Sequence, residues 1–407
     1  MQRLSVTHFE RPVFIIMLLF VYIYNYQTSG MGNTITNLLI ILFIGIELLV
    51  IIENSWEIKS DSPLNSLFFF VSVCVISVIY SISQNDSFAK IKTLFILLLF
   101  LYALMEFLRT EDNFCFVMKA IAFCAIIAAI YLLINSDWKN GKRMDEVIGD
   151  SNQVGAYLSY SFTVVLYCWK KRLLPIYICF PAIFLLITVS MLSGSRSSLV
   201  ITIISISLFS ILTIKKDKYK PLRILLLFAV GIVLLVLVVY LVLTNELLYE
   251  IIGKRFVSFF EIMTVGNSSI NEYSTIERSL MRDLAWEKFT ESVNTFFFGN
   301  GISYFNAYFE SVGGRYCFCH NNYLELLSGV GIFGTSFYYY PYLSSGILAF
   351  KNRKNVNALE AAFVLVLLIQ VFLMHWFVVF YYQKLEFIFI SLMIYCYRIF
   401  LNTDNTH

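Results

Sequence analysis

The sequence is dominated by apolar runs that are each long enough to cross a bilayer as a helix. About 20 apolar residues in a helix span the hydrocarbon core of a membrane. Of the 407 residues, 59% are hydrophobic and only 14% are charged, whereas soluble domains carry about 25% charged residues. The sequence therefore predicts an all-α polytopic membrane protein. The expected helices cover residues 12–29, 35–53, 64–82, 91–108, 114–135, 153–169, 173–192, 197–214, 222–244, 321–349, 358–377 and 380–400.

One long polar segment interrupts this pattern between the ninth and tenth expected helices. Residues 246–319 are rich in Gly, Asn, Ser, Glu and Arg, and His320 then opens the next apolar run. We therefore expect one integral membrane domain over residues 1–407, with about 12 transmembrane helices and one large extracytoplasmic loop at residues 246–319. No internal repeat is evident, which argues against transporter folds built from inverted repeats.

The distribution of Lys and Arg over the connections predicts the orientation of the chain. If the N-terminus is cytoplasmic, the cytoplasmic connections receive more than half of the 30 Lys and Arg residues, and the short outer connections receive far fewer. Both termini are then cytoplasmic, and the long loop lies outside. Three polar segments consequently share the outer face: residues 135–153, residues 193–196 and the long loop.

The composition of the polar segments disfavours several kinds of site. The eight Cys residues mostly stand singly in apolar runs. Cys317 and Cys319 lack a second pair for zinc and are too close together for a relaxed disulfide, so we expect no metal and no cofactor. The long loop holds more acidic than basic residues, and nucleic acid is therefore not an expected partner.

Two outer segments place basic side chains at helix ends. Arg196 ends the tight turn Ser193-Gly194-Ser195-Arg196. Here Gly194 would let the backbone approach an anion while hydroxyls and the guanidinium cradle phosphate. The alternative is that Arg196 reaches lipid headgroups. The connection before the sixth expected helix contains Arg143 and Asn152, and an ordinary solvated loop also explains its charge.

The long loop contains a predicted helix with two arginines on one face. Ser274 and Glu277 form a capping-box pattern, with Ser274 as the N-cap. Arg278 and Arg282 are four residues apart, about 6 Å along one face, so each could grip one phosphate of a diphosphate. Pairing with nearby carboxylates or lipid headgroups is the alternative. An apolar stripe at helical spacing supports the helix: Met281, Leu284, Ala285 and Phe289.

The junction at His320-Asn321 carries the third candidate site. A lone His at a helix start is usually an ordinary interfacial residue, but this one coincides with the end of the long loop. Glu325 lies one turn inside the expected helix. A carboxylate at membrane depth is costly unless it faces a cavity, so Glu325 is a functional candidate.

Together these motifs resemble the O-antigen ligase and polymerase superfamily of bacterial surface-polysaccharide enzymes. The resemblance covers roughly residues 140–345 and depends on the order and spacing of several short motifs. These motifs are Gly149-Asp150-Ser151-Asn152, Ser193-Gly194-Ser195-Arg196, Arg282-Asp283-Leu284-Ala285-Trp286, Gly299-Asn300-Gly301 and His320-Asn321-Asn322-Tyr323-Leu324-Glu325.

The resemblance implies a GT-C-like helical glycosyltransferase in the bacterial inner membrane, with its active site facing the periplasm. Donor and acceptor would be oligosaccharides on polyprenyl diphosphate. An O-antigen or capsule polymerase would move the growing chain en bloc onto a lipid-linked repeat unit. The alternatives are a ligase that moves the finished chain onto the lipid A core, and a flippase of lipid-linked sugars. Membrane lipids and a chain-length regulator are the other expected partners.

The expected chemistry assigns roles to eight residues. Negative charge grows on the departing diphosphate, and fixed guanidiniums stabilise it electrostatically without a metal. A histidine that deprotonates the attacking hydroxyl would give direct displacement with inversion. The predicted catalytic residues are His320, Arg282 and Arg196. The predicted substrate-binding residues are Arg143, Arg278, Asn152, Asn321 and Glu325.

Overall fold

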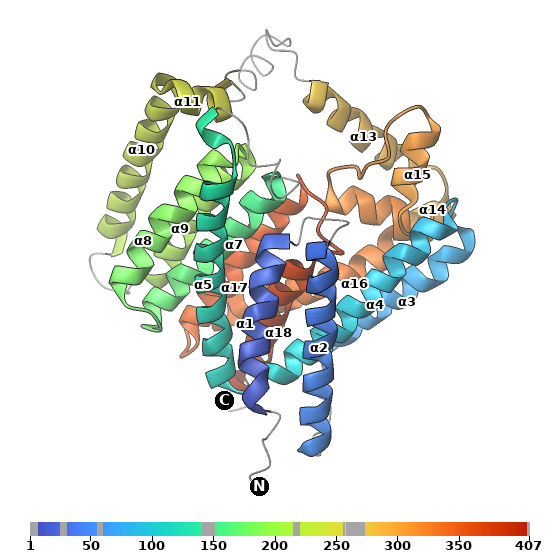
Figure 1. Ribbon diagram of the computed structural model, residues 1–407, viewed down its shortest axis with the longest axis horizontal. Coiled ribbons are helices and arrows are strands. Elements are labelled where there is room, and N and C mark those ends of the chain that lie inside the picture. Colours follow the sequence, from blue (N-terminus) through green and yellow to red (C-terminus); the bar gives the residue numbers. More distant parts are fainter. Residues whose placement is uncertain are drawn as a thin grey trace.

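The computed structural model describes residues 7–24, 31–54, 60–140, 151–214, 220–254, 257 and 273–404, and all regular secondary structure in these ranges is helical. Figure 1 shows the helices gathered into one bundle. The helices are α1 (Thr7–Tyr24), α2 (Met31–Glu53), α3 (Ser62–Ser77), α4 (Gln84–Phe107), α5 (Glu111–Asn135), α7 (Ser151–Lys170), α8 (Ile176–Leu192), α9 (Arg196–Thr213), α10 (Lys220–Thr244), α11 (Glu246–Leu248), α13 (Tyr273–Thr290), α14 (Val293–Phe298), α15 (Tyr304–Ser311), α16 (Asn322–Asn352), α17 (Ala358–His375) and α18 (Lys384–Asp404), with single turns η1 (Val78–Tyr80), η2 (Trp138–Asn140) and η3 (Tyr249–Gly253).

Each of the twelve expected apolar stretches overlaps one of these helices. By length and composition, seven helical segments of the described chain could cross a membrane. The prediction of an all-helical membrane protein is therefore confirmed, while the count of 12 spans stays a prediction. The seven segments are Met31–Glu53, Ser62–Tyr80, Gln84–Phe107, Glu111–Asn135, Arg196–Thr213, Ala358–His375 and Lys384–Thr403.

Contacts between helix ends show that the bundle has two distinct ends. At one end, Arg398 of α18 donates from Nε to Asp61 before α3, at 2.6 Å. At the other end, Lys384 at the start of α18 donates to Asn33 at the start of α2, at 2.7 Å. Both chain termini lie away from α11 and α13 in Figure 1. We call the side of α11 and α13 the insert end and the opposite side the terminal end.

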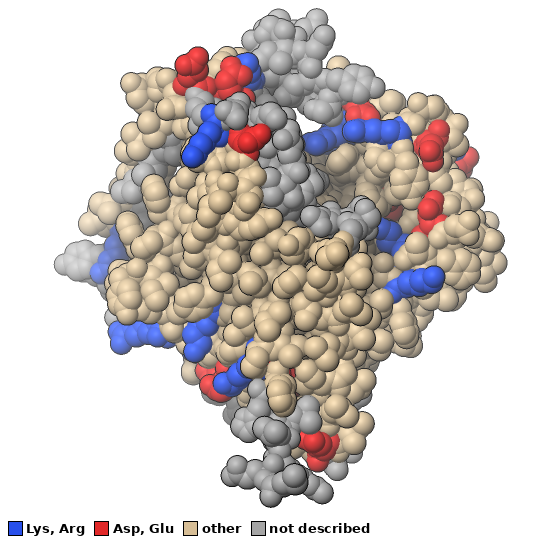
Figure 2. Space-filling model, viewed as in Figure 1, with Lys and Arg blue, Asp and Glu red and all other residues tan. Residues whose placement is uncertain are grey.

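The surface between the two ends is largely uncharged. On the face seen in Figure 2, most charged atoms lie near the upper rim or toward the lower part, and a broad surface without charge separates them. Large apolar side chains in the middle of long helices are exposed, among them Phe184 of α8 and Val236 of α10, which are 71% and 63% exposed. Such exposure is unfavourable in water and is expected for helices surrounded by lipid tails.

α16 is not one continuous helix. Gly331 adopts φ 65° and ψ −171°, which interrupts the helical backbone within Asn322–Asn352. The carbonyls of Ser328 and Gly329 accept hydrogen bonds from the amides of Asn300 (2.9 Å) and Gly301 (2.8 Å) instead. Backbone groups at membrane depth need such partners because lipid offers none. The break therefore receives a segment of the long polar insert.

Glycine allows the insert to approach this break closely. Gly299 has φ +74° and Gly301 has φ +105°, which are left-handed conformations that favour glycine. A Cβ atom at Gly299 would overlap the carbonyl of Gly329, and one at Gly331 would overlap the backbone of Phe297. We call residues 299–301 and the α16 backbone that they contact the glycine clip.

The turn between α3 and α4 holds the same segment from the other side. Tyr80 donates its hydroxyl to the carbonyl of Phe298 at 2.9 Å. The amide of Ile302 donates to Ser77 at 3.0 Å, and its carbonyl accepts from Ser87 at 2.6 Å. α3, α4 and the turn between them consequently hold residues 298–302 of the insert.

Replacing Gly299 with Ala should destabilise the protein. The left-handed backbone conformation costs a non-glycine residue about 1–2 kcal/mol, and the overlap with Gly329 adds to this, so we expect a loss of at least about 2 kcal/mol and a lower Tm in detergent. Gly45→Ala is the matched control, because the space around Gly45 in α2 is open. An unchanged Tm for Gly299→Ala would contradict the glycine clip.

Candidate functional site

The turn before α16 holds His320 in an unusual backbone conformation. His320 has φ 53° and is partly exposed, and a left-handed histidine persists only where its neighbours fix it. Asn321 caps α16 by accepting from the amide of Leu324 at 3.0 Å. The buried carboxylate of Glu325 accepts from the amide of Cys319, also at 3.0 Å. The residues on both sides of His320 are therefore fixed to α16.

The side-chain amide nitrogen of Asn321 makes no hydrogen bond within the described part of the chain. Its side-chain oxygen is used in the helix cap, while its buried Nδ2 has no hydrogen-bond partner. A buried amide donor without a partner is costly. A substrate oxygen or a water molecule next to His320 could accept from it, which suits the predicted substrate-binding role of Asn321.

Asn322 joins this turn to the connection between α17 and α18. Its buried side chain accepts from the amides of Phe380 (2.8 Å) and Tyr381 (3.0 Å) and donates to the hydroxyl of Tyr339 (2.9 Å). These bonds satisfy two backbone donors of the α17–α18 connection, residues 376–383. One side chain thus fixes two separate segments of the insert end.

A buried polar network continues from Asn322 into the bundle. The hydroxyl of Tyr339 lies 2.9 Å from Nδ1 of His375, and Nε2 of His375 lies 3.2 Å from Oε1 of Glu386. Tyr342 donates its hydroxyl to the same carboxylate oxygen. All four side chains are buried. The sequence signal for this network was the presence of His375 and Glu386 at membrane depth, but it assigned them no role.

The start of α9 packs tightly against α7. Ser195 and Ser198 are buried and their hydroxyls lie 2.7 Å apart. A Cβ atom at Gly155 of α7 would overlap the side chain of Ser198. Helix packing therefore takes up the hydroxyls of Ser195 and Ser198, and phosphate binding by this turn stays a prediction. Arg196, which is partly exposed, stays a candidate.

The α17–α18 connection also reaches the start of α7. Gln383 donates to Gln153 at 3.4 Å, and Gln153 follows Asn152, which is partly exposed. The same connection is bonded to Asn322 of α16. The segments that carry Asn152 and Asn321 therefore both contact this one connection. The predicted substrate-binding residue Arg143 lies outside the described residues.

α13 covers the loop that leads to His320. Its predicted apolar stripe is confirmed, because Met281 and Ala285 are fully buried in a small cluster with Cys319 and with Phe305 and Phe309 of α15. Arg278 and Arg282 are partly exposed on the same helix. The helix that bears both arginines consequently packs next to the His320 turn.

The start of α13 differs from the predicted capping box. The helix begins at Tyr273, one residue before the expected N-cap Ser274. Glu277 accepts from Arg315 at 2.9 Å, which ties α13 to the loop before His320. A glutamate three residues after a serine can either complete a capping box or form an ion pair with a distant residue. Local sequence could not identify Arg315 as that partner.

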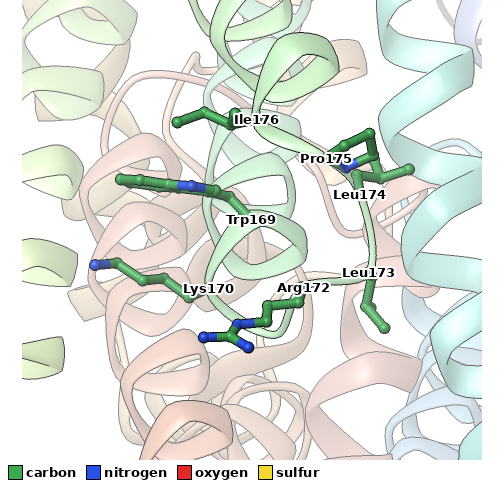
Figure 3. A pocket seen from close by; sticks show the side chains of 7 residues that line it. All are labelled: Trp169, Lys170, Arg172, Leu173, Leu174, Pro175 and Ile176. Atoms are coloured by element: carbon green, nitrogen blue, oxygen red, sulfur yellow. The ribbon is translucent and has the colours of Figure 1, made fainter.

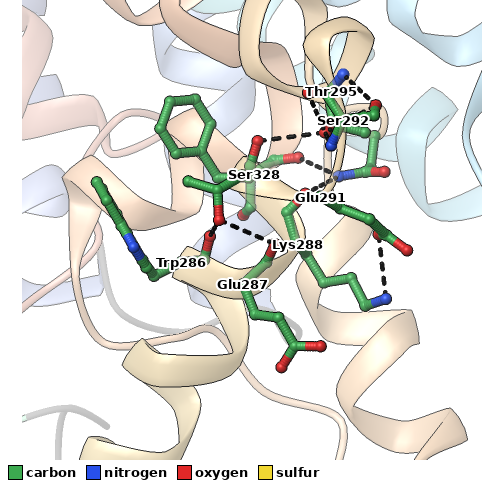
Figure 4. A network of polar contacts seen from close by, with 10 residues as sticks. Trp286, Glu287, Lys288, Glu291, Ser292, Thr295 and Ser328 are labelled. Atoms are coloured by element: carbon green, nitrogen blue, oxygen red, sulfur yellow. Dashed lines mark hydrogen bonds and ion pairs between the residues drawn. The ribbon is translucent and has the colours of Figure 1, made fainter.

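The far end of α13 is fixed to the glycine clip. Asn300 donates from Nδ2 to the carbonyls of Lys288 and Ser328, both at 3.2 Å. Ser292 and Thr295 form a reciprocal capping box at the start of α14. Figure 4 shows these contacts around the junction of α13 and α14. α13 is therefore held at both ends over the start of α16.

The two cysteines of the insert differ in accessibility. Cys319 is fully buried, its Sγ donates to the carbonyl of Asn321 at 3.0 Å, and burial raises the pKa of its thiol well above the usual value. Cys317 is partly exposed, and burial raises its pKa less strongly. Within the described residues no cluster of His, Cys, Asp or Glu is arranged to hold a metal ion.

A separate cavity of about 530 Å³ lies at the terminal end, at the turn between α7 and α8. Figure 3 shows Trp169, Lys170 and Arg172 around it. It contains none of the predicted site residues and begins where α7 ends, about 20 residues from Asn152 along a helix that rises about 1.5 Å per residue. This cavity is therefore not part of the site at the insert end.

The fold is that of an integral membrane protein, and the candidate site residues lie at one end of its helical bundle. Residues 181–339 match the family model described as O-antigen ligase. This match confirms the resemblance of this segment to the O-antigen polymerase and ligase superfamily. It runs from α8 into α16 and therefore includes Arg196, Arg282 and His320, but it begins after Asn152. No curated protein matches the chain.

Replacing Asn322 with Leu should loosen the insert end. Leu fills a similar volume but leaves the amides of Phe380 and Tyr381 buried without acceptors, at about 1–3 kcal/mol for each lost partner. We expect a lower Tm and faster hydrogen exchange in residues 376–383, measured by mass spectrometry. Asn135→Leu, at an exposed helix end, should change neither quantity. Unchanged exchange in Asn322→Leu would show that this side chain does not hold the connection.

Proposed function

We propose that this chain is a glycosyltransferase that moves an oligosaccharide from polyprenyl diphosphate onto a lipid-linked repeat unit. The proposal rests mainly on one observation. The starts of α7, α9 and α16, which carry Asn152, Arg196 and the His320 turn, lie at one end of the bundle, where α13 adds Arg278 and Arg282. Residues at the end of a membrane bundle can reach a substrate whose lipid stays in the membrane while its diphosphate and sugars lie outside it.

In the proposed reaction, positively charged arginines face the negative charge of the diphosphate leaving group. Arg196 and Arg282 stabilise the diphosphate as negative charge develops on its leaving oxygen, and Arg143 and Arg278 contribute to binding. His320 accepts the proton of the attacking sugar hydroxyl. That hydroxyl attacks the anomeric carbon directly, the bond to the diphosphate breaks, and the configuration inverts.

The structure supports a positioning role for two predicted substrate-binding residues. Glu325 accepts from the amide of Cys319, and Asn321 caps α16, so both fix the turn that presents His320. Asn321 also has its unpartnered amide donor for a sugar oxygen. A fixed general base lowers the entropy that the transition state must lose.

The polymerase is the preferred activity, with transfer en bloc at the outer leaflet of the bacterial inner membrane. The His-Asn-Asn-Tyr-Leu-Glu-Leu-Leu sequence and the Ser-Gly-Ser-Arg turn are more typical of polysaccharide polymerases, including those that build capsules. The ligase is the alternative activity, and the family match supports either of the two. A GT-C-like helix arrangement and a chain-length regulator as partner belong to the same proposal.

The product of a defined reaction distinguishes the candidates. Purified protein incubated with lipid-linked repeat units should yield a ladder of chain lengths on a gel. A single transfer onto added lipid A core without a ladder would instead identify a ligase. Movement of lipid-linked sugar across a vesicle membrane without any new glycosidic bond would identify a flippase.

Arg196→Ala and Arg282→Ala should each lower the polymerisation rate by about 100-fold or more, as expected when a donor to transition-state charge is removed. The rate is measured from ladder formation at saturating substrate. Arg353→Ala, at the C-cap of α16 and the terminal end, is the matched control and should retain near wild-type activity. If either site variant polymerises normally, that arginine is not in the diphosphate clamp.

The orientation predicts which cysteine a membrane-impermeant maleimide reaches. Cys317 should be labelled in spheroplasts without permeabilisation, whereas the buried Cys319 should stay unlabelled. Labelling should accelerate as pH rises, because the thiolate is the reactive form and burial raises the pKa of Cys317. Cys317→Ser is the control. Labelling of Cys317 only after permeabilisation would reverse the proposed orientation.

A further inference from the structure

Lys90 lies where three segments of the insert end meet. It belongs to the second turn of α4, and its Nζ lies 3.4 Å from the ring centroid of Tyr382 and 4.7 Å from that of Phe318. The ring of Tyr381 is 5.8 Å away. Ammonium groups are attracted to the faces of such rings. One side chain of α4 therefore joins the loop before His320 to the α17–α18 connection.

The negative charge near Lys90 belongs to the same turn. Lys90 interacts electrostatically with Glu325 and with Asp86 of α4. Glu325 is 4% exposed and accepts from the amide of Cys319. A buried carboxylate needs a compensating charge or hydrogen bonds to stay ionised. Lys90 is therefore placed to favour the ionised form of the carboxylate that holds Cys319.

The aromatic contact of Lys90 and its electrostatic interaction with Glu325 both bear on residues directly before His320. The aromatic contact is with Phe318, and the charge interaction is with Glu325, which holds Cys319. His320 itself has a left-handed backbone that depends on fixed neighbours. Loss of the ammonium would weaken both contacts together and release the residues that precede His320.

We propose that Lys90 is a positioning residue for the glycosyl transfer, because its ammonium fixes Phe318 and Glu325 and thereby orients His320. The predicted effect of Lys90 on the rate of glycosyl transfer rests on the proposed function. The structural consequence, a fixed Phe318–Cys319 segment, does not depend on which reaction the protein performs.

The charge of Lys90 can be separated from its packing by substitution. Lys90→Met keeps a long unbranched side chain but removes the charge, whereas Lys90→Arg keeps a cation that also binds aromatic faces. Lys92→Met is the matched control, because Lys92 lies on the same helix two residues away and is exposed. All variants are made in the full-length protein.

The first measurement is the kinetics of polymerisation with lipid-linked repeat units. Lys90→Met should lower kcat by about 10- to 100-fold, since a misplacement of about 1 Å can have an effect of this size, while KM changes less than about threefold. Lys90→Arg should recover most of kcat, and Lys92→Met should match the wild type. Equal activity of Lys90→Met and Lys92→Met would overturn the proposal, as would a Lys90→Arg variant as impaired as Lys90→Met.

The second measurement reports on the segment without requiring glycosyl transfer. The rate of maleimide labelling of Cys317, resolved by peptide mass spectrometry, should rise severalfold in Lys90→Met and stay unchanged in Lys92→Met. A rise restricted to Lys90→Met supports the contact even if the wild type forms no polymer, in which case only the proposed function fails. An unchanged labelling rate in Lys90→Met would overturn the positioning role.

A double variant tests whether Lys90 acts through Glu325. If it does, adding Glu325→Gln to Lys90→Met should cause little further change in Cys317 labelling, because the two effects are then not additive. Additive increases in the labelling rate would show that Lys90 and Glu325 act independently, which would overturn this part of the proposal.

Discussion

The break in α16 at Gly331 is the constraint on which the insert end depends. Inside a membrane, a helix that gives up its backbone hydrogen bonds must find other donors, and the amides of Asn300 and Gly301 supply them. The insert is thereby fixed to a membrane helix at one defined position. From that position α13 extends over the loop before His320, and α3 and α4 support the clip through Tyr80, Ser77 and Ser87. The segments of the proposed site are thus held by hydrogen bonds to the backbone of the insert.

A second set of polar contacts brings the remaining helices to the same end. Asn322 holds the α17–α18 connection, which also contacts Gln153 near the start of α7. Beneath it, hydrogen bonds link Tyr339, His375 and Oε1 of Glu386 within the bundle. Such bonds lower the cost of placing polar groups at membrane depth. The arginines of α9 and α13 that we propose to bind an anionic substrate lie on segments of this same end.

The helices could be predicted from the sequence, but the contacts that hold the segments of the proposed site could not. Apolar runs specify helices locally, and the order of Arg196, Arg282 and His320 suffices for a resemblance that the family match supports. The supporting contacts join residues far apart in the chain, such as Tyr80 with Phe298 or Lys90 with Tyr382. Periodicity carries no information on such pairs. For this reason the sequence of the first helices predicted their number but not their contacts with the insert. For the same reason Glu277 was assigned to a helix cap rather than to an ion pair with Arg315.

The hydrogen bonds of Asn322 also have a consequence for how the protein is made. The chain is synthesised from its N-terminus, so α16 enters the membrane before residues 380 and 381 exist. Until those residues arrive, the side-chain oxygen of Asn322 lacks both of its backbone donors. The turn that presents His320 is therefore completed only when the last two helices insert. A chain that stalls before residue 380 would therefore lack this support for the His320 turn, even though the segments that carry Arg196 and Arg282 have already been made.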